Sequence, residues 1–113
     1  MNKVYVTQET VRRDNNTGAR VPRFDITPAT VYGELEYLTP EGNISFAPAP
    51  IIKTLKEKLR NFTDDDYILP VGDPILIAMA TMIAADMNMG KVKMLKWDKH
   101  IGSYIVINID KGV

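Results

Sequence analysis

The sequence predicts a single α+β domain over residues 1–113, with a mixed sheet of about five strands, two helices, and a β-hairpin at each end. Three observations predict this class. Segments rich in β-branched and aromatic residues lie near both ends, two helical segments lie between them, and 113 residues suit one domain of ~100–200 residues. Hydrophobic residues at 45% and charged residues at 25% argue against a disordered or low-complexity chain.

The first 26 residues predict a β-hairpin. β-branched and aromatic residues are dense over 3–13, and residues 19–26 can run back as a second strand. The turn-forming run Asp14-Asn15-Asn16-Thr17-Gly18 lies between them. Because Pro22 has no N–H to donate, we expect the second strand at a sheet edge or irregular.

A third strand is predicted over 31–38, where apolar and polar residues alternate and Val31 begins the apolar face. A turn over 39–42 and a short returning strand over 43–46 follow.

Residues 51–62 predict an amphipathic helix, preceded by Pro50, which suits the first turn because its missing N–H costs nothing there. Its apolar stripe consists of Ile51, Ile52, Leu55, Leu59 and Phe62. A buried strand over 67–71 comes next, although Pro70 weakens it.

Gly72, Asp73 and Pro74 predict the start of a second helix, with Asp73 as the N-cap and Pro74 at the first position. This helix runs to about Met89, and Gly90 ends it. Because it is apolar on nearly every side, we expect it to be covered on several sides and to be the most buried helix.

The chain ends in a predicted hairpin, with strands over 91–97 and 104–110 and a loop over 98–103. Both faces of the last strand are partly apolar. We therefore expect it to be an inner strand, or an edge strand that something covers.

Composition excludes several classes of site. Without cysteine there are no disulfides, thiolate zinc sites, iron–sulfur clusters or cysteine nucleophiles, and one histidine cannot form a His-pair metal site. The net charge of zero excludes a strongly basic protein but not a local basic patch. The longest apolar run, over 74–85, is too short for a membrane helix of about 20 residues. We expect a cytoplasmic protein without a cofactor and without membrane contact.

The turn at Gly72 and Asp73 allows two interpretations. A phosphate could bind at the helix N-terminus, which would suit a small enzyme or a nucleotide-binding protein. Helix capping is favoured, because the Asp73 carboxylate would repel an anion and Pro74 removes a donor.

Two other polar features are candidate sites. The carboxylates of 64–66 could bind magnesium or calcium, but a solvated loop is favoured. His100 is the one candidate base of neutral pKa, and an exposed position in the last loop is favoured. No acid–base pair is identifiable, so we expect no enzyme and assign no catalytic residue and no metal ligand.

Basic residues gather on the two predicted hairpins, near aromatic ones, in a pattern that can contact phosphates and bases. The candidate nucleic-acid-binding residues are Arg12, Arg13, Arg20, Arg23, Lys91, Lys93 and Lys96. The alternative is a charged solvent face.

Methionine is abundant in the second half, and its adaptable side chain suits binding surfaces as well as cores. The candidate partner-binding residues are Met82, Met89, Trp97 and Tyr104.

The second half resembles a group of short proteins encoded by tailed bacteriophages, over Val31 to Asp110. The resemblance rests on Gly72-Asp73-Pro74 before an apolar, Ala-rich helix, and on Leu95-Lys96-Trp97-Asp98, Tyr104-Ile105 and Ile109-Asp110. It implies a viral origin and a host-cytoplasm setting. The group has no assigned activity, so no catalytic or binding residue carries over.

The leading hypothesis is a small, non-enzymatic, phage-encoded interaction protein that binds a host or viral protein. Homo-oligomers are a further expectation, through the apolar second helix or the isoleucine-rich last strand. The alternative is a nucleic-acid-binding module that uses the basic hairpins.

Overall fold

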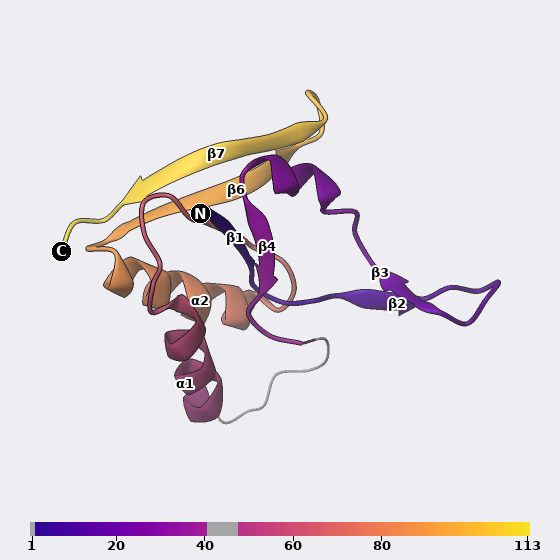
Figure 1. Cartoon of the computed structure of the whole chain (residues 1–113), viewed down its shortest axis with the longest axis horizontal. Helices are drawn as coiled ribbons and strands as arrows, with labels where there is room; N and C mark the ends of the chain where they lie inside the picture. The colour runs from indigo at the N-terminus through magenta and orange to yellow at the C-terminus, as the bar shows by residue number, and fades with distance from the viewer. Residues whose placement is uncertain (1, 41–47) are drawn as a thin grey trace.

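The computed structural model describes residues 2–40 and 48–113 and has the predicted α+β class (Figure 1). Its elements in chain order are β1 (Lys3–Val6), β2 (Val11–Arg13), β3 (Arg20–Pro22), the 3-10 helix η1 (Thr27–Val31), β4 (Glu34–Tyr37), α1 (Pro48–Leu59), β5 (Tyr67–Leu69), α2 (Pro74–Met87), β6 (Lys91–Asp98) and β7 (Ser103–Asp110).

Five strands form one mixed sheet, in the order β4-β1-β5-β6-β7. The first four are parallel to their neighbours, and β7 pairs antiparallel with β6. The C-terminal hairpin is therefore confirmed, with strands one residue longer than predicted at the loop. β2 and β3 form a separate two-stranded sheet. The returning strand predicted over 43–46 lies outside the described residues.

The first predicted strand is wrong in its pairing. β1 is a central strand between β4 and β5, and only β2 and β3 form the N-terminal hairpin, across the predicted turn. Val4, Tyr5 and Val6 are all buried, so β1 is covered on both faces, as parallel strands usually are. β-propensity alone does not separate such a strand from one arm of a hairpin.

The strand predicted from Val31 begins three residues later, at Glu34. Thr27 and Pro28 open η1 instead, and Val31 closes it with its side chain 81% exposed. Proline suits the first turn of such a helix because it donates no N–H. The alternation of apolar and polar residues over 31–38 therefore predicted a strand that is longer than the observed one.

Two helices cover one face of the sheet, and η1 lies over the other (Figure 1). The larger core cluster joins α1 and α2 to β5 and β6, with Leu55, Leu59, Ile68 and Leu76 fully buried. A smaller cluster packs around Ala29 of η1 on the opposite face. α1 starts at Pro48, slightly before the predicted helix.

The second helix is less covered than predicted. α2 buries more side chains than α1, yet Ile75 and Met82 are 63% and 66% exposed. The sheet and α1 pack against two sides of this helix, which leaves its outer side open. The helix is capped by Asn88. Met89 and Gly90 then both have a positive φ, whereas the sequence predicts this role for Gly90 only.

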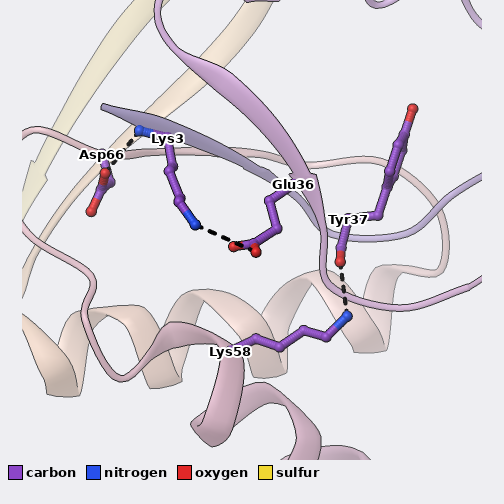
Figure 2. A network of polar contacts seen from close by, with 5 residues as sticks. All are labelled: Lys3, Glu36, Tyr37, Lys58 and Asp66. Atoms are coloured by element: carbon purple, nitrogen blue, oxygen red, sulfur yellow. Dashed lines mark hydrogen bonds and ion pairs between the residues drawn. The ribbon is translucent and has the colours of Figure 1, made fainter. Parts of the chain in front are cut away.

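Polar contacts hold β1 and β4 to their surroundings (Figure 2). The backbone N–H of Lys3 donates to the Asp66 carboxylate over 2.9 Å, and the Lys3 ammonium lies 3.5 Å from the Glu36 carboxylate. From α1, the Lys58 ammonium donates to the Tyr37 carbonyl over 3.0 Å. The side chain of Asp66 is only 5% exposed. The prediction that the three aspartates of 64–66 lie in a solvated loop is therefore wrong for Asp66.

Among the described helices, none is both long and apolar enough to cross a membrane.

Candidate functional site

An open groove of about 900 Å³ lies at the carboxyl end of β5. Four parts of the chain form its walls: the segment from Arg23 to Ile26, the turn from Leu69 to Gly72, Ile77 of α2, and the last two strands. Clefts at the carboxyl ends of parallel strands commonly bind ligands. Its apolar walls include Phe24, Val71, Ile77, Trp97 and Ile107.

The groove exists because β5 stops early. β5 ends at Leu69, since Pro70 cannot donate to a ladder, whereas β6 continues to Asp98. The two strands share the single Cα pair Ile68 with Met94. Beyond this pair, β6 continues without a paired β5 residue beside it. The end of β6, which carries Trp97, forms one wall of the groove.

The turn between β5 and α2 is held by the end of β1. The Thr7 hydroxyl accepts from the Val71 N–H over 2.7 Å and donates to the Val71 carbonyl over 2.5 Å. The Gln8 amide oxygen accepts from the Asp73 N–H over 3.0 Å. Thr7 and Gln8 are buried, so buried hydrogen bonds hold this wall of the groove in place.

The capping interpretation of Asp73 is confirmed. Its carboxylate accepts from the Ile75 N–H over 2.8 Å, and Pro74 occupies the first helical position. One donor of the α2 N-terminus is thus already used and another is missing, which does not favour a phosphate.

Of the four predicted partner-binding residues, the groove includes Trp97 and Tyr104. Their rings pack edge to face at 5.1 Å, with Trp97 46% exposed and Tyr104 buried. Burial, and then the Asp25 charge, raises the pKa of Tyr104. Met82 and Met89 are exposed but are not in the lining of the groove.

Charged groups in the lining come from Arg23, Asp25 and Lys96. Hydrogen bonds from Thr27 lower the pKa of Asp25, and its carboxylate accepts the Thr27 N–H over 3.0 Å. The sequence prediction missed the segment around Asp25. Its one signal was Phe24, a large apolar residue between charged neighbours, which the structure leaves 55% exposed.

The basic residues do not form one surface, although Arg23 and Lys96 both line the groove. The hairpin of β2 and β3 extends away from the main sheet (Figure 1), with Arg13 directly opposite Arg20. On β6, Lys91 and Lys93 share one face, and Lys96 lies on the other because strand side chains alternate. Thus the lysines expected to join the arginines are divided between two faces.

Several of these cations already have partners. The Arg23 guanidinium donates to the Val11 carbonyl over 3.4 Å, and the Lys93 ammonium lies 4.3 Å from the centre of the Tyr67 ring.

His100 is exposed in the loop between β6 and β7, as favoured from the sequence. Within residues 2–40 and 48–113, no group of three His, Cys, Asp or Glu side chains could hold a metal ion.

The fold and the groove define a small α+β protein with an open groove lined mainly by apolar residues. The model of the Phage Pam3 gp32-like protein family matches residues 2–111, and the chain belongs to this family. This is a phage family, which confirms the resemblance to phage proteins predicted from the sequence. No curated protein and no solved structure matches the chain.

Proposed function

We propose that this phage-family protein is a non-enzymatic interaction protein that binds an apolar segment of a host or viral protein in the groove. The supporting observation is the lining. Apolar side chains from four parts of the chain converge on one open surface, with a half-exposed Trp97 at its wall. Aromatic residues of this kind are enriched where protein interfaces gain most of their affinity.

The charges around the groove suggest the chemistry of the partner. Arg23 and Lys96 outnumber Asp25 among the lining residues. A segment with apolar side chains flanked by an acidic residue would complement this lining. Fully burying one Leu or Phe of such a segment contributes about 1.5–3 kcal/mol, so several anchors are needed to offset the ~4–15 kcal/mol that association costs.

Comparative affinity capture from infected host cells tests the groove. We expect the wild-type chain to retain a partner that Trp97→Ser loses, because Trp97 provides exposed apolar area in the wall. Met82→Ser is the matched control, since Met82 is also exposed but is not in the lining. Circular dichroism checks that all three proteins are folded.

A synthetic peptide from the captured protein then completes the test. Binding should change the fluorescence of Trp97, the single tryptophan of the chain. If Met82→Ser loses the partner while Trp97→Ser keeps it, the binding surface is the open side of α2 and the groove proposal is wrong.

Nucleic-acid binding by the β2–β3 hairpin is the second candidate. The favouring observation is a projecting two-stranded ribbon in which four arginines and one aspartate lie between Val11 and Arg23 (Figure 1). Two-stranded ribbons of this kind fit the major groove of DNA.

Titration with an oligonucleotide at ~50 mM salt tests this candidate, since phosphate contacts weaken steeply as salt rises. Arg12→Glu with Arg20→Glu should abolish binding without unfolding the chain, because exposed substitutions usually change stability by less than about 0.5 kcal/mol. Unchanged affinity in this double variant rules the hairpin out as the contact.

A further inference from the structure

β7 forms an outer edge of the main sheet (Figure 1). It has eight residues, contains no proline, and carries no charged side chain before Asp110. Natural edge strands are usually protected by short length, charged residues, proline or bulges. The opposite edge strand, β4, has such protection, because it is four residues long and carries Glu34 and Glu36. β7 is therefore the edge that is open to pairing.

The ladder between β6 and β7 shows which backbone groups point outward. The Lys111 N–H donates to the Gly90 carbonyl over 2.9 Å, in register with the rest of the ladder. Hydrogen-bonded pairs alternate along an antiparallel ladder, so the odd-numbered residues of β7 bond to β6. The residues whose N–H and C=O groups face away from β6 are Tyr104, Val106, Asn108 and Asp110.

One outward carbonyl of this edge already has a hydrogen-bond partner. The Tyr32 hydroxyl donates to the Tyr104 carbonyl over 2.9 Å, in agreement with an outward-facing carbonyl there. The central part, at Val106 and Asn108, lies beyond this contact.

We propose that β7 pairs antiparallel with β7 of a second copy of this chain, around a two-fold axis that passes through Ile107. In this register Val106 lies opposite Asn108 of the second copy, and their outward N–H and C=O groups bond to each other. The contact is isologous, so it closes as a dimer with one continuous sheet across both copies.

The side chains of β7 select this register. Ile105, Ile107 and Ile109 all point to the helix-bearing face, and Ile107 and Ile109 are 39% and 40% exposed. With the axis at Ile107, Ile105 meets Ile109 of the second copy and Ile107 meets itself. A shift of the axis to Val106 would place Ile109 opposite Ser103 instead. The proposed register alone matches apolar with apolar at all three positions.

Charge favours a second copy as the occupant. In the proposed register, Lys111 lies opposite Ser103 of the second copy, and Asp98 is the partner of Ser103 on β6. Lys111 and Asp98 of the other copy thus lie on the same face, two strands apart, where a long ammonium side chain reaches a carboxylate. The two-fold axis repeats this ion pair at the other end of the interface.

Cysteine cross-linking tests the register, because the chain contains no cysteine of its own. At Ile107, a pair that is not hydrogen-bonded places the two Cα atoms about 4.5 Å apart, within the range for a disulfide. We expect Ile107→Cys to form a covalent dimer on mild oxidation. Ile105→Cys is the matched control and should not cross-link to itself. A mixture of Ile105→Cys and Ile109→Cys chains should cross-link to each other.

Sedimentation at about 50 μM tests the backbone pairing, since dimer populations depend on concentration. The wild-type chain should have about twice its mass of 12.7 kDa. Asn108→Pro removes an outward N–H without affecting the bonds to β6 and should be monomeric, whereas Asn108→Thr should remain dimeric. A wild-type mass of 12.7 kDa, a dimer that persists in Asn108→Pro, or equal cross-linking of Ile105→Cys and Ile107→Cys would overturn the proposal.

Discussion

Tyr5, on the inner strand β1, makes the stability of the fold depend on pH. Its side chain is buried, and its ring packs 5.8 Å from the ring of Phe62. Burial first, and then the negative charges of Asp66 and Glu36, raises its pKa from 10.0 to about 12. The phenol is therefore held in its neutral form more strongly in the folded chain than in the unfolded one.

Because the folded-state pKa is raised, the stability contributed by Tyr5 is fully present below about pH 10 and is lost as the pH rises through about 12. We expect the wild-type chain to lose more free energy of unfolding than Tyr5→Phe between these two pH values. Urea denaturation of both proteins at several alkaline pH values measures the difference. Equal losses in the two proteins would contradict the role of Tyr5.

Gly72 is the residue that lets β1 approach the turn before α2. Its φ of +99° is in the region that favours glycine, and a Cβ there would lie on the Gln8 side-chain oxygen that accepts the Asp73 N–H. Gly72→Ala should thus cost more than about 2 kcal/mol, from backbone strain and displacement of Gln8 together.

Gly102 provides the control for Gly72. It also has a positive φ, of +67°, but open space where a Cβ would be placed. Gly102→Ala should cost only the backbone strain of about 1–2 kcal/mol. If thermal unfolding shows the same loss for both variants, the Gln8 contact contributes nothing.

At the scale of elements, α2 has one buried side and one exposed side. Substitutions at two neighbouring residues, Met82 and Ile83, test this difference. Ile83→Ala should cost about 2–5 kcal/mol because it leaves a cavity in the core. Met82→Ala should change stability by less than about 0.5 kcal/mol, since Met82 is 66% exposed. Chemical denaturation compares them, and a large loss in Met82→Ala would mean that the outer side of α2 is covered.

The sequence predicted helices more accurately than strand partners. The start of α2 depends on Asp73 and Pro74, which act within one turn, so local chemistry sufficed. β1 was assigned to the wrong sheet because its partners lie far along the chain, and a run of β-formers does not indicate which strand it will meet.

The candidate site was predicted in part for a similar reason. Trp97 and Tyr104 lie opposite each other in a hairpin that the sequence predicts. Phe24 reaches the same groove through the tertiary fold, and no periodicity surrounds it. The same holds for Thr7 and Gln8, whose contacts to the β5–α2 turn cross more than half of the chain.

At the scale of the whole molecule, the β2–β3 hairpin is an appendage of the sheet (Figure 1). None of its strand residues is fully buried, and the Arg23 N–H donates to the Thr10 carbonyl over 2.9 Å at its base. Because this hydrogen bond brings Thr10 and Arg23 next to each other in space, a Gly-Gly linker can replace residues 11–22.

We expect this shortened chain to fold with the cooperative unfolding of the wild type, since both core clusters lie outside the removed residues. Circular dichroism and thermal unfolding provide the measurement. Loss of cooperative unfolding would show that the hairpin supports the sheet rather than extending from it.

The central position of β1 also affects how the chain folds during synthesis. β1 leaves the ribosome before both of its sheet neighbours, β4 and β5, and Val4 finds its β5 partner only when Tyr67 has been made. Pairings this distant close large loops before they gain contacts, which slows folding. The β6–β7 hairpin forms from neighbouring residues and has no such delay. The nascent chain therefore carries the buried apolar residues of β1 without their β5 partner until Tyr67–Leu69 has been made, a period in which they are open to chaperones.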